Sequence, residues 1–222
     1  MSVDLLEFFK NVEDENYCII KSFELDYSQG SDIDIFCFDI QSFSKKVITI
    51  ANKYIDKGYI IQINNSRELH WHIDIIKDTK IEIRFDLYGT MPYYKNINVK
   101  EALFSSIIEN RIFETINDVK IYKQLLVDEL LLRYIEYIEY YKLRPDKVKH
   151  LDFILKEIKN DEDNKLFLDK LHYYTKLPQI LEPEKKYTIL DTIKEILNKI
   201  KQTPINELPN KTIKFIKRRI GK

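Results

Sequence analysis

Two aspartates separated by one isoleucine, Asp32-Ile33-Asp34, are the residues of this sequence whose type and spacing most favour chemistry. Residues 32–39 begin with an alternation of polar and apolar side chains, which predicts a β-strand. On a strand, side chains at i and i+2 point to the same face, about 7 Å apart. The two carboxylates can therefore reach one pair of divalent cations, and hard oxygen ligands of this kind suit Mg²⁺.

A third carboxylate, Asp86, stands near the end of another predicted strand, residues 80–88. It shares its face with Glu82 and Arg84 and interrupts the apolar pattern at the strand's end. With Asp86 in reach, three carboxylates would form a two-metal site for in-line transfer of a phosphoryl or nucleotidyl group. Aspartates are also common on solvated strand faces, so the D-x-D pair taken alone favours a strand that binds no metal.

Two other uses of a D-x-D pair fit this chain poorly. A calcium loop of the EF-hand type has a different spacing, and here the intervening Ile33 and Ile35 are apolar. Glycosyltransferases normally place a D-x-D motif after a long nucleotide-binding α/β segment, and only 31 residues precede Asp32. Both alternatives are therefore disfavoured.

The residues before Asp32 extend the pattern. Ser22 is followed by nine residues and then by Asp32-Ile33-Asp34, with an apolar residue between the aspartates. Together with a third aspartate on a later strand, this spacing resembles the DNA polymerase β-like nucleotidyltransferase superfamily over residues ~15–90. In that family a Gly-Ser or Gly-Gly pair opens the motif, whereas here Lys21 stands where the glycine is usual.

The resemblance implies a reaction and a set of roles. An NMP group would pass from an NTP to a small-molecule acceptor, such as a sugar or sugar phosphate of surface-polysaccharide synthesis, with release of pyrophosphate. The cofactor would be two Mg²⁺ ions, with Mn²⁺ as the alternative ion. Asp32 and Asp34 would ligate both metals, and Asp86 would hold the catalytic metal and assist deprotonation of the acceptor. The nucleotide would be contacted by Lys21, Ser22, Gly30 and Ser31.

Two rival interpretations remain open. The chain could be a non-catalytic nucleotide-binding or interaction module with a degenerate triphosphate loop, as Lys21 in place of glycine would suggest. It could also be a nucleotidyltransferase of the toxin–antitoxin type, acting on protein or RNA. Arg84, Lys147 and His150 are weaker candidates for contacts with the acceptor or a phosphate, because Lys147 and His150 share a face at the start of a predicted helix.

A second group of metal-binding side chains lies in the sequence His70-Trp71-His72-Ile73-Asp74. Alternation places His70, His72 and Asp74 on one strand face, with Trp71 on the opposite face, where we expect it in the core. Zinc is disfavoured here, because no cysteine or further histidine lies nearby to complete a tetrahedral set. We expect these residues to line the nucleotide cleft or to face solvent.

The elements expected around these residues give an α+β fold, in which a small mixed sheet of polymerase β-like nucleotidyltransferase topology is followed by an all-helical C-terminal domain. The boundary is expected near residue 95, between a catalytic domain (1–95) and a helical accessory domain (96–222). Strands are predicted over 17–23, 32–39, 59–64, 69–76 and 80–88, the last two as a hairpin. Helices are predicted near the N-terminus and over 42–57, 99–110, 127–142, 147–159, 165–175, 183–202 and from 210.

Composition narrows the class of protein. The 222 residues carry 36 basic and 36 acidic side chains, and this zero net charge disfavours a processive nucleic-acid polymerase. Residues 211–222 nevertheless hold six bases and no acid, which fits a solvated terminus or, more weakly, contact with an anionic membrane or RNA. Cys18 and Cys37 lie in apolar runs and are expected to be buried thiols. We find no signal peptide or membrane-spanning window, and expect a cytoplasmic protein.

Overall fold

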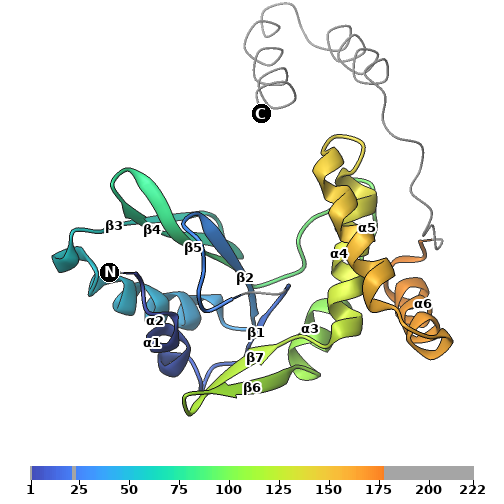
Figure 1. Ribbon diagram of the computed structural model, residues 1–222, viewed down its shortest axis with the longest axis horizontal. Coiled ribbons are helices and arrows are strands. Elements are labelled where there is room, and N and C mark those ends of the chain that lie inside the picture. The colour runs from blue at the N-terminus through green and yellow to red at the C-terminus, as the bar shows by residue number, and fades with distance from the viewer. Residues whose placement is uncertain (1, 22–23, 178–222) are drawn as a thin grey trace, which may run out of the picture.

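A seven-stranded mixed β-sheet organises the part of the chain that the structure describes, residues 2–21 and 24–177 of a computed structural model (Figure 1). The strands lie in the order β3-β4-β5-β2-β1-β7-β6. Their bounds are β1 Tyr17–Ile19, β2 Ser31–Cys37, β3 Ile60–Arg67, β4 His70–Lys77, β5 Lys80–Tyr88, β6 Ile112–Ile116 and β7 Val119–Lys123. The helices of the same residues are α1 Leu5–Asn11, α2 Ile40–Asn52, α3 Ala102–Glu109, α4 Leu126–Tyr140, α5 Val148–Glu157 and α6 Asp161–Thr175, with short 3-10 helices at Ile55–Lys57 and Pro145–Lys147. The predicted α+β class is confirmed.

Most predicted elements are present with shifted ends. The strand expected at residues 80–88 coincides with β5, and β4 joins it through a tight turn in which Asp78 and Thr79 have positive φ (49° and 64°). Gly58 ends the helical stretch after α2 with φ 84°, a conformation that glycine adopts without strain. The helices predicted over 183–202 and from 210, and the basic segment 211–222, lie outside the described residues. Within the described ranges, no helix is long and apolar enough to cross a membrane.

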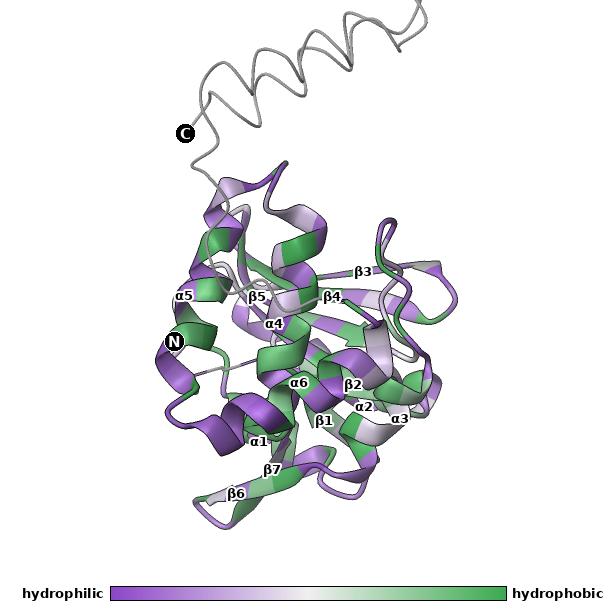
Figure 2. Ribbon diagram, turned by 90° about the vertical axis from the view of Figure 1, so that its right-hand side faces the viewer, coloured by the Kyte–Doolittle hydropathy of each residue, from purple (hydrophilic) through white to green (hydrophobic). Residues whose placement is uncertain are grey.

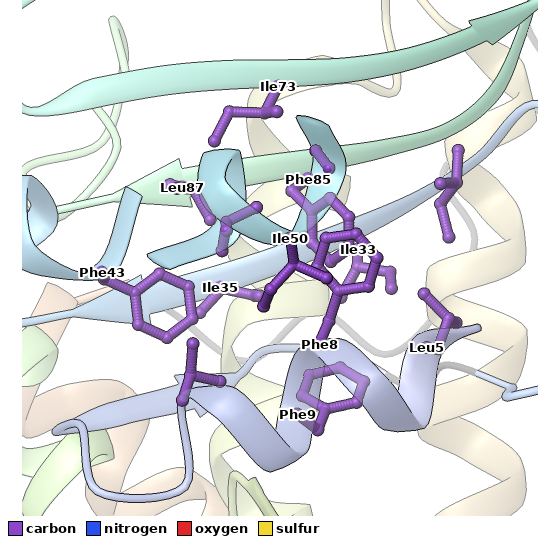
Figure 3. Packing of buried hydrophobic residues seen from close by; sticks show 14 of the residues in the cluster. Leu5, Phe8, Phe9, Ile33, Ile35, Phe43, Ile50, Ile73, Phe85 and Leu87 are labelled. Atoms are coloured by element: carbon purple, nitrogen blue, oxygen red, sulfur yellow. The ribbon is translucent and has the colours of Figure 1, made fainter. Parts of the chain in front are cut away.

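One face of the sheet is covered by α1 and α2. Asp4 caps α1 by accepting hydrogen bonds from the backbone N–H groups of the first turn, and Asp39 caps α2 in the same way. Figure 3 shows Phe8 and Phe9 of α1 and Phe43 of α2 packing with strand side chains in this layer. The strand residues labelled there are Ile33, Ile35, Ile73, Phe85 and Leu87, all of them buried. This apolar layer fixes β2 and β5 side by side, which matters because both carry candidate aspartates.

The opposite face of the sheet is apolar at one end and polar at the other. Cys18, Ile20 and Phe36 are buried there against side chains from α3, α4, α5 and α6. Figure 2 shows hydrophobic (green) and hydrophilic (purple) segments alternating along these helices, as expected when one side of each helix is buried. Both cysteines are buried free thiols, as the sequence predicts. Towards β5 and β4 the same face becomes polar, and the candidate functional residues lie there.

The prediction that residues 96–222 are entirely helical is wrong, because β6 and β7 extend the sheet from this part of the chain. The two strands form a hairpin whose turn residues, Asn117 and Asp118, both have positive φ (48° and 63°). This is the backbone pattern of a type I′ turn, which asparagine and aspartate tolerate better than other non-glycine residues. β7 then pairs in parallel with β1 through Ile19 and Lys123. The sheet is thus completed by residues beyond the predicted boundary.

Candidate functional site

The polar part of the sheet face is built by three neighbouring strands, β4, β5 and β2. Their register places side chains in three rows across the strands. The rows are His70 with Tyr88 and Phe36, His72 with Asp86 and Asp34, and Asp74 with Arg84 and Asp32. Neighbouring strands lie about 4.8 Å apart, so Asp34 and Asp86 are direct neighbours and Asp32 follows on the same face. The structure therefore brings the three predicted carboxylates together.

Asp86 is surrounded by aromatic and imidazole side chains. Its Oδ1 lies 2.7 Å from His70 Nε2 and 3.2 Å from His72 Nε2. Its Oδ2 accepts a hydrogen bond of 3.0 Å from the Tyr88 hydroxyl. Burial, together with the negative charges of Asp34 and Asp86, raises the pKa of Tyr88, so this phenol stays protonated and acts as a donor. Asp86 is thereby held with one oxygen bound to Tyr88 and the other facing the histidines.

Asp34 makes its principal contact with Lys21, at the end of β1. The Lys21 ammonium lies 2.8 Å from Asp34 Oδ2, and the Asp34 side chain is only 10% exposed. Burial raises the pKa of Asp34, although the charge and hydrogen bond of Lys21 act in the opposite direction. Lys21 has φ 76°, in the left-handed region that favours glycine. The position at which the resembled family carries glycine therefore keeps a glycine-like backbone here, but bears a cationic side chain.

The same ammonium reaches α4, where it contacts Glu136. Lys21 Nζ lies 2.8 Å from Glu136 Oε1, and Lys147 Nζ lies 2.7 Å from Glu136 Oε2. Burial would raise the pKa of Glu136, but His150, Lys21 and Lys147 outweigh it and the pKa is lowered. Burial would likewise lower the pKa of Lys21, but Asp34 and Glu136 outweigh it and the pKa is raised. Both groups are thus charged at neutral pH, and they tie the sheet to the helices.

His150 extends this network towards Arg133. The Arg133 guanidinium lies 3.2 Å from His150 Nδ1 and the Lys147 ammonium lies 3.2 Å from Nε2, so each ring nitrogen faces a cation that can only donate. Nε2 also lies 3.3 Å from Glu136 Oε2. Burial lowers the pKa of His150 despite the opposing effect of Glu136, which agrees with a neutral imidazole. Arg133 also binds Glu129, one turn earlier on α4.

A cavity of about 380 Å³ opens between β1, β2 and the helical segment 133–150. Asp32 and Asp34 form its acidic side. The basic residues that line it are Lys21, Arg133, Arg144, Lys147 and Lys149. A second cavity, of about 320 Å³, is also lined by Asp32, together with Ser28 and Ser31. Carboxylates and cations thus line one space that is large enough for a small ligand, and Lys21 lies in contact with Asp34 at its edge.

The other predicted site residues are placed as follows. Gly30 has φ 87° and is the last turn residue before β2, so its conformation alone explains a glycine. Ser31 is the first residue of β2 and its hydroxyl lies 3.3 Å from that of Ser28. Ser22 lies outside the described residues. Arg84 donates two hydrogen bonds to the Asp74 carboxylate, at 2.6 and 2.8 Å.

The group expected from His70, His72 and Asp74 forms differently. Asp74 is occupied by Arg84, and the two histidines converge on Asp86 of the next strand instead. Trp71 packs against the core on the other face, as predicted, but it remains partly exposed.

Glu136 is the site residue that the sequence analysis missed. It lies between Ile135 and Tyr137 on α4, and its side chain is only 13% exposed. A usable signal was present, because Glu129, Arg133 and Glu136 follow one another at i, i+4 and i+7 and so line one side of α4. Charged residues at this spacing on a helix rich in leucine and tyrosine indicate a buried ionic network.

Comparisons with known proteins do not assign a function to this site. The chain matches no family model and no curated protein. Its chemistry must therefore be argued from three adjacent carboxylates, two histidines beside one of them, and a cavity with an acidic and a basic side.

Proposed function

We propose that the chain is a metal-dependent nucleotidyltransferase that moves an NMP group from an NTP to a small-molecule acceptor. The observation that carries this proposal is the cavity in which Asp32 and Asp34 face a group of lysines and arginines. A metal–nucleotide complex requires both features, since carboxylates bind the cations and basic side chains bind the phosphate oxygens. Such a reaction consumes NTP, which supports the expected cytoplasmic setting.

The connectivity of the sheet also supports the nucleotidyltransferase topology that we propose. β1 pairs with β2 in antiparallel fashion, and β2 pairs with β5 in parallel. The D-x-D strand is therefore flanked by the strand that precedes the lysine-containing loop and by the strand with the third aspartate. This is the arrangement needed for Lys21, Asp34 and Asp86 to act on one ligand.

The donor chemistry of the three carboxylates fits Mg²⁺. Asp32, Asp34 and Asp86 offer only hard oxygen atoms, and a cation, the Lys21 ammonium, already contacts one of these oxygens. These residues would hold two Mg²⁺ ions. When bound, the metals supply charge neutralisation for the transferred phosphoryl group and its leaving group. Asp86, the carboxylate nearest to the two histidines, would also assist removal of the proton from the acceptor hydroxyl.

The basic side of the cavity would bind the triphosphate. Arg144 and Lys149 are exposed and extend from the segment that follows α4. Lys147 and Lys21 are held in place by Glu136, so their ammonium groups are fixed before a ligand arrives. Fixed donors lose little conformational entropy on binding, and a set of them suits a polyanion. A small acceptor such as a sugar or sugar phosphate remains the class we propose for the second substrate.

The test is a binding and turnover experiment on a nucleotide panel. ATP, CTP, GTP and UTP are titrated by calorimetry with Mg²⁺ or with EDTA, using the full-length protein and the Asp34→Asn variant. We expect one NTP to bind only with Mg²⁺ and to lose at least about tenfold in affinity in the variant, because the cation loses a charged ligand. Asp56→Asn, an exposed residue beside the other face, is the matched control and should bind normally.

Turnover separates the two main interpretations. Release of pyrophosphate with a pool of sugar and sugar-phosphate acceptors supports the transferase, whereas Mg²⁺-dependent binding without turnover supports the non-catalytic module. Failure of every nucleotide to bind at millimolar concentration contradicts the transferase and leaves an interaction module that binds no nucleotide.

A further inference from the structure

We propose that His70, His72 and Asp86 form a binding site for a divalent transition-metal ion, with two imidazole nitrogens and one carboxylate oxygen as ligands. One ligand atom from each residue lies within 4.8 Å of the other two. Imidazole donors suit Zn²⁺, Fe²⁺ and related ions and are poor ligands for Mg²⁺. The inference goes beyond the proposed function, because it holds whether or not the chain transfers nucleotides; Asp86 is the one ligand that the two proposed sites share.

The three atoms form a triangle of the size that a metal ion requires. His70 Nε2 lies 2.7 Å from Asp86 Oδ1 and 3.0 Å from His72 Nε2, and the third side, from His72 Nε2 to Asp86 Oδ1, is 3.2 Å. An octahedral ion with bonds of about 2.1 Å places adjacent ligand atoms about 3.0 Å apart. The three residues therefore match one face of an octahedron, and the opposite face would be open to water or substrate.

Hydrogen bonding alone satisfies this triangle poorly. Each Nε2 can carry a single proton, and Asp86 Oδ1 can only accept. If both nitrogens are protonated, the two N–H groups can donate to Asp86, but the 3.0 Å contact between them has no acceptor. If one nitrogen is unprotonated, its lone pair faces the carboxylate oxygen. A cation at the common centre makes all three contacts favourable at once.

The surrounding residues hold the ligands in place. Tyr88 donates to Asp86 Oδ2 and so directs Oδ1 towards the histidines. Its ring also stacks on His70, with centroids 4.3 Å apart and planes at 15°. Partners of this kind orient metal ligands and contribute to affinity. All three ligands lie on paired strands, which are more rigid than loops.

The site is accessible to an ion from solvent. The side chains of His70 and His72 are 22% and 29% exposed, and that of Asp86 is 14% exposed. Asp74 does not compete for the same ion, because Arg84 holds both of its oxygens. The third ligand, which is missing from the sequence around the histidines, is therefore supplied by Asp86 of the adjacent strand β5.

The experiment measures ion binding directly on the untagged, EDTA-treated protein. Zn²⁺ is titrated by calorimetry in the presence of excess Mg²⁺, and the imidazole ¹⁵N resonances of the four histidines are followed by NMR. We expect one Zn²⁺ per chain, with coordination shifts at Nε2 of His70 and His72 only. His72→Gln and Asp86→Asn should each lower the affinity by at least about 100-fold, and Tyr88→Phe by about tenfold.

Two control variants separate this site from the proposed nucleotide site. His172→Gln removes an exposed histidine on α6 and should bind Zn²⁺ normally. Asp32→Ala should also bind Zn²⁺ normally, while losing Mg²⁺-dependent nucleotide binding if the proposed function is correct. Thermal unfolding of each variant without metal shows whether it is folded, and the variant Asp86→Asn serves if His72→Gln is not. Absence of Zn²⁺ binding, unchanged affinity in both folded ligand variants, or coordination shifts at other histidines would overturn the inference.

Discussion

Replacing Lys21 with methionine removes the ammonium group that lies between two buried carboxylates. Lys21 Nζ is 2.8 Å from both Asp34 and Glu136, whose side chains are 10% and 13% exposed. Loss of one partner from a buried ion pair costs 3–5 kcal/mol in typical proteins, because a charge is left uncompensated. Glu136 keeps Lys147 in the variant, so we expect the lower end of that range, about 3 kcal/mol at pH 7. In a chain of this size such a loss lowers Tm by about 6–12 °C.

The sharper test is how the difference in the free energy of unfolding between wild type and Lys21→Met changes with pH. In the native protein the lowered pKa of Glu136 stabilises the fold above its ordinary value of 4.5, and this contribution is lost as the pH falls through the lowered pKa. The raised pKa of Lys21 stabilises the fold below its ordinary value of 10.5, and that contribution is lost only as the pH rises through the raised pKa. Both contributions are therefore present at pH 7. In Lys21→Met the Asp34 carboxylate, whose pKa burial already raises, loses its cation and is relieved by protonation, whereas Glu136 keeps Lys147. The difference in the free energy of unfolding between wild type and variant should therefore narrow between pH 7 and pH 5.

Urea unfolding in metal-free buffer at both pH values measures the two effects. Lys46→Met is the matched control, because Lys46 binds Asp14 and Glu15 at the surface, where Asp14 is 77% exposed. Its loss should cost less than about 1 kcal/mol. A Lys21→Met variant as stable as the control, or a difference that does not narrow at pH 5, would show that Lys21 does not compensate these carboxylates.

Two further predictions concern the second half of the chain. Asp118→Gly should raise the free energy of unfolding by about 0.5–1 kcal/mol. The reason is that Asn117 and Asp118 both have positive φ, and glycine suits the second position of a type I′ turn. A variant that is less stable than wild type in urea unfolding would contradict this prediction. Glu139→Ala should lower the free energy of unfolding by about 2 kcal/mol, because the buried Glu139 carboxylate accepts hydrogen bonds from the backbone N–H groups of Lys95 (2.8 Å) and Asn96 (3.0 Å). An effect below about 0.5 kcal/mol in urea unfolding would show that water replaces these hydrogen bonds.

Local features of the sequence predicted the parts of the site that depend on one or two strands. Alternation at Asp32 and Asp34 placed both carboxylates on one face, and the strand with Asp86 was predicted with its observed bounds. Such patterns are reliable because the side-chain period of a strand is set by its backbone. The pattern within each strand does not predict that β2 and β5 pair, because that pairing depends on how both strands pack against α1 and α2.

The partner of the histidines could not be predicted from the hairpin, because the pairing of β4 with β5 is irregular. Lys77 pairs with Lys80, and continuing this register would place His72 opposite Phe85. A register shift between Ile75 and Ile76 moves the pairing by one residue, so that His72 lies opposite Asp86. A one-residue shift exchanges the two faces of a strand, and here it decides whether the histidines meet a carboxylate or a core phenylalanine.

The contacts of Lys21 explain why the two halves of the chain must be considered together. Its ammonium compensates Asp34 on the sheet and Glu136 on α4, so it can be displaced from Asp34 without losing its other partner. A divalent cation bound at Asp34 would repel Lys21, and the freed ammonium would lie at the border of the basic side of the cavity, where the phosphates of a nucleotide would accept it. Metal and nucleotide would then bind with positive coupling, because each relieves the charge that the other introduces. If the proposed function is correct, the Lys21 ammonium would balance the charge of Asp34 before the metal binds and would then contact the phosphates, while Glu136 keeps it at the edge of the cavity.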